Sequence, residues 1–575
     1  MKTLRDYLKQ IKTEIKKMLK SKGLIVFTGL FVLFCASLPV LVKAIETKEQ
    51  QLQNEYYYYI DSLTINGIDI ASSNPFYYEI RRTKSHLEFL EKSASSDIDD
   101  LMIDYEDEIL DYYFESSKIV ENDDDFRVSA VAEVINIYEE IFIISHLNIE
   151  PEDMIEALKI LNIGSYDETE INDEYYSLSE EERKVLIAQY KSESEKLDNI
   201  IFQNDYMGYL DYLIENEEKH IKDLIDEIER LEQSIVGSPS METLFSDKIE
   251  EMRIAIRKTE EIDIPILEYR KENYILIDSS DWRDYALNSK KRAQYFFVDL
   301  EDPMTEKEYY ESFGESNGKT YKDYIDEYDE SVENNTERLM VSENSLASGK
   351  PDMRYVYEGS RQRVENFLSF NVLLIFFVII IGGSLASAEF KNGTARLLFI
   401  RPKNRVKIIL SRFFGLIALM YIVYFSCVFI NMISNGFVFG FKDFGYPNYT
   451  MSSGSKGVSF FAYMIPKNFL FTLPIIFFAA FAYFMSIATK NTSASVSIPF
   501  VLYIASIIFM EFVGYDEKFN WISYTPLPYF AIESVLWDYY EINTTLLKGV
   551  SILLGLSIIF VVLGNIILKK RDIQC

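Results

Sequence analysis

The sequence of 575 residues has a formal net charge of −32 and only three cysteines, Cys35, Cys427 and Cys575. Its charge is unevenly distributed, because residues 44–366 hold 79 acidic and 33 basic side chains whereas the other 252 residues hold 11 acidic and 25 basic ones. The acidic segment would repel phosphate, which excludes nucleic acid as a partner. Its lack of cysteine excludes a disulfide framework and a thiolate metal site.

The first 22 residues predict an amphipathic helix lying on a membrane surface. Leu4, Leu8, Ile11 and Ile15 recur at helical spacing, and lysines stand between them. Basic helices with one apolar face are typical of the membrane interface. The alternative is a plain basic anchor that only holds the N-terminus on one side of the membrane.

Six apolar segments are long enough to cross a bilayer, which takes roughly 20 residues of helix. The first, residues 23–43, is too long for the apolar region of a signal peptide. The other five are about Phe367–Ala388, Ile408–Ile433, Phe469–Thr489, Ala494–Val513 and Leu546–Leu568. We therefore expect an α-helical membrane protein with six spans.

The orientation of the spans follows from lysine and arginine near their ends, because these residues gather on the cytoplasmic side. Basic residues outnumber acidic ones in residues 1–22, 389–407 and 569–571. A chain with six spans places these three segments on the same side. The sequence therefore predicts a multi-pass protein of a bacterial plasma membrane, with both termini in the cytoplasm and residues 44–366 outside.

Residues 44–366 predict a mainly helical extracellular domain. They are rich in tyrosine, isoleucine and leucine, and a segment of this size can fold around its own core. Shorter helices are expected over 81–119, 128–147 and 179–203. Short strands are expected over 274–277 and 295–298.

The clearest periodicity of this domain lies between Leu210 and Ile235. Apolar residues there are spaced alternately by four and by three, which is the heptad pattern of a coiled coil, and Glu217 interrupts it once. Residues 236–239 then break the helix, and helical spacing resumes over 245–256. The pattern predicts an antiparallel coiled-coil hairpin.

The acidity of this domain has two interpretations. It can serve solvation of an exposed domain, or it can capture a cationic ligand such as a basic peptide. The sequence leaves both open.

The loop after the second span has the most specific motif of the chain. From Ser387 to Lys407 it reads SAEFKNGTARLLFIRPKNRVK, in which a glutamate is followed after three residues by Gly-Thr, then by an arginine, two leucines, a proline and another arginine. This pattern resembles the ABC-2 type permease family, the membrane subunits of many bacterial ABC exporters. The residues that carry the resemblance are Glu389, Gly393, Thr394, Arg396, Leu397, Leu398, Pro402 and Arg405. It covers residues 1–43 and 367–575, with residues 44–366 as an insertion.

The motif also has a local physical interpretation. Gly393 permits a tight turn, and Thr394 can cap a new helix. Leu397 and Leu398 give that helix an apolar face, and Pro402 ends it. We expect a short helix parallel to the membrane, with an ordinary basic loop as the alternative. In the family this helix fits a groove on an ATP-binding subunit, so the resemblance implies that residues 389–407 form a coupling loop.

The chain has no nucleotide-binding loop of its own. The nearest match, Gly314 to Thr320, has three residues between its glycines where four are needed. We therefore expect a transport subunit that is not an enzyme and holds no cofactor, with ATP bound by a separate ABC ATP-binding subunit. The resemblance implies pairing with a second copy or a homologous permease in the lipid membrane, and export of a peptide, antimicrobial or lipid-like substrate.

A protein of another class remains the alternative. Some membrane-anchored surface scaffolds or receptors, of the phage-infection or secretion-accessory type, have a large helical outer domain and a permease-like bundle without transport. The loop motif favours the permease.

Overall fold

The structure is a computed structural model that describes residues 2–20, 22–60, 63–65, 68–93, 97–146, 159, 161, 178–235, 239–313, 320–356, 359–391, 405–451, 456–536 and 539–570. Its packing divides the chain into two compact units. We call residues 1–46 with 352–575 the helical bundle, and residues 47–351 the acidic unit. Residues 352–366, grouped by charge with the acidic segment, thus pack within the bundle.

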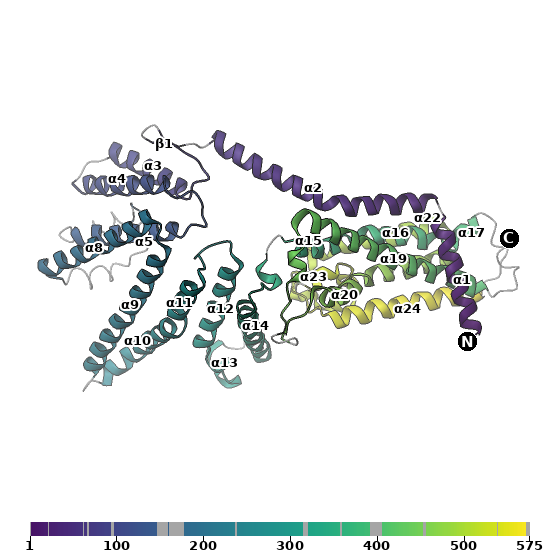
Figure 1. Cartoon of the computed structure of the whole chain (residues 1–575). Coiled ribbons are helices and arrows are strands. Elements are labelled where there is room, and N and C mark those ends of the chain that lie inside the picture. The colour runs from purple at the N-terminus through teal and green to yellow at the C-terminus, as the bar shows by residue number, and fades with distance from the viewer. Residues whose placement is uncertain are drawn as a thin grey trace. The chain divides into compact units, whose positions relative to one another are not determined.

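Helices of very different lengths, most of them apolar, build the bundle (Figure 1). They are α1 (Lys2–Leu19), α2 (Lys22–Ile60), α15 (Ser360–Phe367), α16 (Val372–Ser384), α17 (Ser387–Lys391), α19 (Arg405–Phe439), α20 (Phe460–Phe471), α21 (Leu473–Thr489), α22 (Thr492–Val513), α23 (Ile532–Leu536) and α24 (Leu546–Lys570). The single-turn 3₁₀ helices η3 (Met353–Tyr355), η4 (Leu368–Asn371), η5 (Lys442–Gly445) and η8 (Pro528–Phe530), and the longer η7 (Glu517–Tyr524), connect them.

Among the described residues, six helical stretches are long and apolar enough to cross a membrane. They are Leu24–Lys48, Ser360–Ser384, Val406–Phe439, Phe460–Thr489, Thr492–Val513 and Leu546–Lys570. Each contains or largely overlaps one of the six predicted segments. The prediction of an α-helical, multi-pass membrane protein is confirmed as far as the number, length and apolar composition of the helices are concerned.

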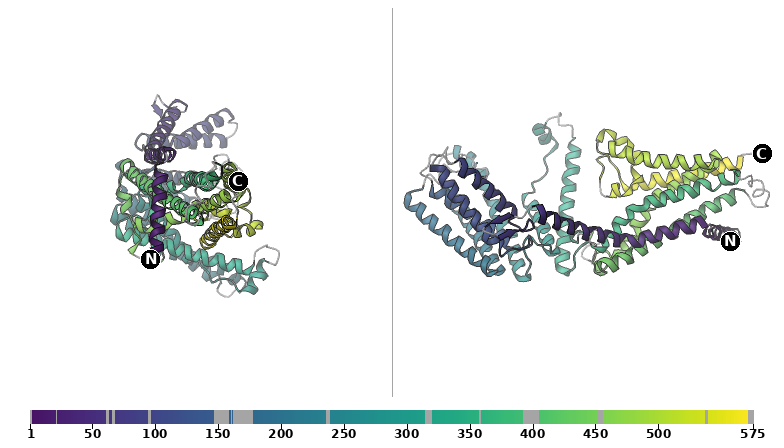
Figure 2. Two further views of the ribbon diagram at one scale, coloured as in Figure 1. Left: turned by 90° about the vertical axis from the view of Figure 1, so that its right-hand side faces the viewer. Right: turned by 90° about the horizontal axis from the view of Figure 1, so that it is seen from above.

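Different helices lie at the two ends of the bundle. α1, α17 and the last turns of α24 lie at one end, and α15 and α20 lie at the other (Figures 1 and 2). The helix predicted for residues 1–22 is present as α1, which packs on α19. The two helices are close at Gly415, where an added Cβ would make an ordinary van der Waals contact of 3.6 Å with Cβ of Glu14. The rings of Tyr7 and Phe414 pack in a T-shaped arrangement, with their centroids 6.5 Å apart.

The first span has a proline whose missing hydrogen bond is compensated by the third span. Pro39 lies inside α2 and has no N–H to donate to the carbonyl of Cys35. Instead, Asn431 Nδ2 of α19 donates to Cys35 O at 3.1 Å, and Ser434 Oγ donates to Ala36 O at 2.6 Å. Side chains of neighbouring helices must satisfy such groups, because the hydrocarbon of a membrane offers no water.

The acidic unit is mainly helical. Its helices are α3 (Tyr77–Ser93), α4 (Asp97–Ser117), α5 (Arg127–Ser145), α8 (Glu180–Gln203), α9 (Tyr206–Ile235), α10 (Pro239–Lys258), α11 (Ile264–Asn273), α12 (Trp282–Asp299), α13 (Glu306–Phe313) and α14 (Tyr321–Ser348), with a π turn, η1 (Thr259–Asp263), between α10 and α11. An antiparallel hairpin of β1 (Leu63–Ile65) and β2 (Ile68–Ile70) pairs Thr64 with Asp69. α3, α4, α5, α8 and the start of α9 enclose one apolar core.

The long heptad segment forms α9, and the segment after the predicted break forms α10. Ile228 of α9 packs with Ile249 and Met252 of α10 in a separate small core. α9 ends at Ile235 and α10 begins at Pro239. Apolar residues of α9 and α10 therefore pack together, whereas the predicted break at residues 236–239 lies mostly outside the described residues.

The two predicted strands of this unit are wrong. Residues 295–298 lie inside α12, which begins after Asp281, whose carboxylate accepts a hydrogen bond from the Arg283 N–H. Residues 274–277 form an irregular turn that starts with Tyr274 at φ 48°. An aromatic run such as residues 295–298 is compatible with either a helix or a strand. The helix that starts at the Asp281 cap continues through these residues and therefore decides their structure.

Candidate functional site

The predicted coupling loop lies mostly outside the described residues. Gly393, Thr394, Arg396, Leu397, Leu398 and Pro402 belong to residues 392–404, and the predicted loop helix lies there too. Arg405 is the first residue of α19. Glu389, on α17, is the predicted site residue whose side-chain contacts the structure describes.

Glu389 joins a cluster that ties three helices together. Arg412 Nη2 of α19 lies 2.9 Å from Glu389 Oε1, and Arg412 Nε lies 3.7 Å from Glu14 Oε2 of α1. Arg412 Nη1 also donates to the carbonyl of Leu385 at 3.2 Å. We call Glu14, Glu389 and Arg412 the Arg412 cluster. It links the start of the loop to the third span and to the N-terminal helix.

The break between α16 and α17 is also held from another span. The N–H groups of Ala386 and Ser387 both donate to Ser486 Oγ of α21, at 2.8 and 2.9 Å. Lys490, just after α21, lies 5.4 Å from the centre of the Phe390 ring. The residues that lead into the loop are therefore fixed to α1, α19 and α21.

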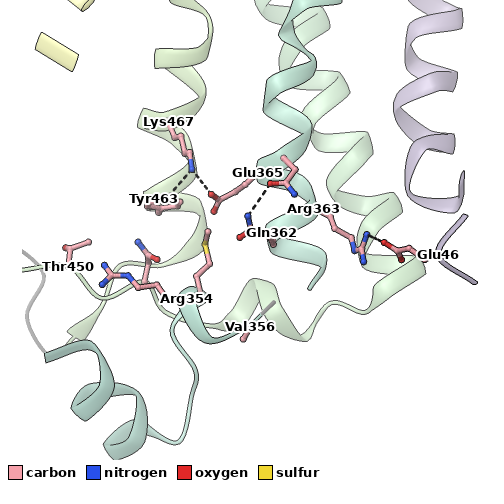
Figure 3. Close-up of a pocket in the computed structure, with 12 residues that line it drawn as sticks. Glu46, Arg354, Val356, Gln362, Arg363, Glu365, Thr450, Tyr463 and Lys467 are labelled. Carbon is pink, nitrogen blue, oxygen red and sulfur yellow. Dashed lines mark hydrogen bonds and ion pairs between the residues drawn. The ribbon is translucent and has the colours of Figure 1, made fainter. Parts of the chain in front are cut away.

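At the other end of the bundle lies a polar pocket of about 850 Å³ (Figure 3). It is lined by Glu46, Met353, Arg354, Val356, Gln362, Arg363, Glu365, Asn366, Asn448, Thr450, Tyr463 and Lys467. These residues come from α2, from η3 and α15, and from α20 with the segment before it. The first, second and fourth spans therefore contribute to one pocket.

A buried ion pair lies in this pocket. Lys467 Nζ of α20 contacts Glu365 Oε2 of α15 at 2.6 Å, and the two side chains are only 9% and 2% exposed. Tyr463 OH lies 3.0 Å from the same Nζ. Glu365 Oε1 accepts no hydrogen bond from any described residue. Breaking such a pair is costly, because it leaves an uncompensated charge in a low dielectric.

A second ion pair crosses from the first span to the second. Arg363 Nη1 lies 2.6 Å from Glu46 Oε1, and the Arg363 guanidinium stacks 4.1 Å from the centre of the Phe439 ring. Figure 3 shows this pair and the Lys467–Glu365 pair on opposite sides of α15.

The segment before α15 is attached to the loop after α19. Asp352 Oδ2 accepts from the Tyr449 N–H at 2.6 Å, and Asp443 Oδ2 accepts from the Ser360 N–H at 2.8 Å. Buried Arg361 donates from Nη1 to the Tyr446 carbonyl at 2.7 Å. These bonds explain why residues 352–366 belong to the bundle, and they hold one wall of the pocket.

An apolar cleft of about 150 Å³ adjoins the pocket. Leu38, Pro39 and Val42 of α2, Phe367 and Phe370, and Asn431 and Asn435 of α19 line it together with Arg363 and Asn366. The last two residues line both spaces. The polar pocket therefore has an apolar space as its neighbour beside the first span.

Sequence reasoning missed the pocket and the partners of Glu389. Glu365 and Lys467 are 102 positions apart, and no local pattern pairs them. One signal was present, because Lys467 stands inside an apolar run, where a charge is costly and often functional. Among the described residues, no group of three or more His, Cys, Asp or Glu side chains could hold a metal ion.

Two comparisons with known proteins concern the bundle. Residues 335–574, less than half of the chain, match a family described as "Protein of unknown function (DUF2705)". The chain is also similar to the "Uncharacterized protein YhcI" of Bacillus subtilis (strain 168), with 27% identity over 230 residues, which covers 36% of this chain and 68% of YhcI. Neither the family description nor the name of the relative states an activity. The function of the chain is therefore proposed below from its motif and its structure.

Proposed function

We propose that the chain is the permease subunit of an ATP-driven ABC transporter of the ABC-2 type, which exports a peptide, antimicrobial or lipid-like substrate. The observation that carries the proposal is the loop motif over residues 389–405, which directly follows the second span and begins at Glu389. ATP is bound by a separate subunit, and two permease chains, identical or homologous, assemble in the plasma membrane.

The Arg412 cluster supports a coupling role for this loop. A force on the loop reaches Glu389 first and passes through Arg412 to α19 and Glu14. Ser486 gives a second connection to α21. A loop that only connects two spans does not need these contacts with other helices. A loop that transmits movement from an ATPase to the spans does need them.

In this proposal the N-terminus and the loop face the cytoplasm, and the acidic unit lies outside with α9 and α10 as a coiled-coil hairpin. The negative charge of the acidic unit keeps this exposed unit solvated, and capture of a cationic peptide is its second candidate role. The runner-up for the whole chain is a surface scaffold or receptor without transport.

The experiment is co-expression of the chain with the ABC ATP-binding proteins of its own host, tested one at a time. Purified alone, the chain should hydrolyse no ATP, and the co-purified complex should hydrolyse it. Leu397→Asp should abolish co-purification, because it puts an unpaired charge into an apolar contact, which typically costs a few kcal/mol. Lys403→Gln, in the same loop but outside the motif, is the matched control.

Gly393→Val should also impair the complex, because a β-branched side chain would block the turn or the close contact. Neither substitution lies in a span, so membrane insertion should be normal. If both variants bind the ATPase and hydrolyse ATP normally, the loop is not the coupling element and the scaffold becomes the better proposal.

A further inference from the structure

The polar pocket and the apolar cleft together have the form of a site for an amphiphile. They have Arg363 and Asn366 in common and are therefore neighbours, so a ligand that reaches past these two side chains would contact both spaces. Arg363 stands three residues after the start of the second candidate span, and Glu46 stands two before the end of the first. At 1.5 Å per helical residue, both lie close to the span ends, where lipid head groups are found.

The charges of the pocket are balanced in pairs. Glu46 pairs with Arg363 and Glu365 pairs with Lys467, each at 2.6 Å. Arg354, the remaining charged residue of the lining, lies 3.8 Å from Asp352. A ligand with a single charge would upset this balance at the buried pair of Glu365 and Lys467, whereas a zwitterion leaves the sum of the charges unchanged.

One atom of the lining lacks a partner within the described part of the chain. Glu365 is 3% exposed, and its Oε1 accepts no hydrogen bond there, although Oε2 is bound by Lys467. This oxygen is itself buried, so a ligand reaches it only when the Glu365 side chain turns toward the pocket, and a ligand that donates an N–H would then satisfy it. A primary ammonium group can donate, and a quaternary ammonium group cannot.

We propose that this site binds an aminophospholipid of the phosphatidylethanolamine type. Its ammonium group donates to Glu365 Oε1, its phosphate lies by Arg354, whose side chain is 42% exposed, and an acyl chain begins in the cleft beside Phe370. The proposal goes beyond the transport function, because binding here requires no ATPase.

The test is a titration of the purified, delipidated full chain in detergent, with bound lipid counted by native mass spectrometry. The probes are dihexanoyl phosphatidylethanolamine, the matching phosphatidylcholine and phosphatidylglycerol, and free phosphoethanolamine. Phosphatidylethanolamine should bind saturably and about tenfold or more tighter than phosphatidylcholine, which has no N–H, since one charge-assisted hydrogen bond separates them. Phosphatidylglycerol and free phosphoethanolamine should bind more weakly still.

Variants locate the site. The double variant Glu365→Met with Lys467→Met removes the pair without leaving a lone charge, and it should abolish the preference for phosphatidylethanolamine over phosphatidylcholine. Arg354→Gln, at a partly exposed position, should weaken both lipids alike and keep the preference. Glu511→Gln, outside both spaces, is the control and should change nothing.

Several results would overturn the proposal. Equal affinity for phosphatidylethanolamine and phosphatidylcholine in the wild type would remove the role of Glu365, and equal affinity for free phosphoethanolamine would remove the role of the cleft. Absence of saturable lipid binding would refute the site itself. If the double variant fails to fold, the lipid preference of the wild type and the Arg354→Gln result still decide the matter.

Discussion

At the scale of single residues, Arg412 links the residues before the predicted loop to two other helices. One guanidinium serves two carboxylates and a carbonyl that belong to different segments, and its side chain is only 17% exposed. Glu14 has a second partner, Lys17 at 2.8 Å, but that lysine is 60% exposed. The two basic partners of Glu14 should therefore contribute very differently to stability.

We expect Arg412→Gln to lower the free energy of unfolding by about 2–3 kcal/mol, because it removes the one charged group that contacts both of the largely buried carboxylates, Glu14 and Glu389. Lys17→Gln should cost at most about 1 kcal/mol, since exposed ion pairs contribute little. Chemical unfolding of the purified chain in mixed micelles measures both. Equal effects would mean that Arg412 does not hold the cluster together.

The proline of the first span permits a second test with single residues. Asn431→Leu leaves the Cys35 carbonyl without its donor and should destabilise the bundle by about 1 kcal/mol. Pro39→Ala restores an N–H that can bond to the same carbonyl within α2. In the double variant the part of the cost that comes from the Cys35 carbonyl should therefore vanish, whereas the part that comes from the lost bond of Asn435 Nδ2 to Asn431 Oδ1 should remain. Additive effects in this cycle would show that the contact between Asn431 and Cys35 does not stabilise the bundle.

At the scale of elements, the sequence predicts what depends on local pattern. The six apolar stretches, α1, and the apolar positions of α9 and α10 all follow from spacing and composition within about 20 residues. The strand at 295–298 was wrong because the run Tyr-Phe-Phe-Val has no period of its own, and the cap at Asp281 lies 14 positions before it.

The candidate sites depend on contacts between distant segments, and sequence reasoning found them only in part. Glu389 was found through its motif, but Arg412 and Glu14 stood in segments read only as a span and a basic helix. The pocket combines α2, α15 and α20, and its ion pairs join residues 317 and 102 positions apart. Only a folded chain brings such residues together.

The helix α5 of the acidic unit makes a pH-dependent prediction. Burial, with help from the neighbouring Glu140, raises the pKa of Glu139 from 4.5 to about 7. The folded state therefore keeps a proton that the unfolded state releases. This contribution to stability is complete below about pH 4.5 and is lost as the pH rises through 7.

Residues 47–351, which have their own core, should thus become easier to unfold with urea between pH 5.5 and 8. Glu139→Gln should flatten this dependence and stabilise the unit at pH 8. Glu181→Gln removes the same charge at an exposed position of α8 and should leave the slope as it is. If both variants gave the same slope, the general repulsion of the acidic unit would explain the effect and Glu139 would have no special part.

At the scale of the whole molecule, the bundle has an attachment point for the loop at one end and a ligand-sized pocket at the other. In the proposed topology the first faces the cytoplasm and the second faces outwards. ATP-driven movement of the loop would then act, through α19, on helices that also line the cleft. The orientation of the chain is the premise of this scheme.

Single cysteines test the orientation in a chain whose Cys35, Cys427 and Cys575 have been replaced. Cysteines at Asp123 and Asn334 should react with a membrane-impermeant thiol reagent in whole cells. A cysteine at Asn392 should react only after lysis. Labelling of position 392 from outside would refute the six-span topology.

The central claim is that the loop after the second span docks on an ATP-binding subunit, and site-specific photo-crosslinking tests it most directly. A photoreactive amino acid at Leu397, in the chain co-expressed with the ABC ATP-binding protein that co-purifies with it, should give a crosslink to that protein. The same group at Asp516, between the fifth and sixth spans, should give none. Crosslinking from position 516, or its absence from position 397 in a correctly inserted chain, would contradict the account.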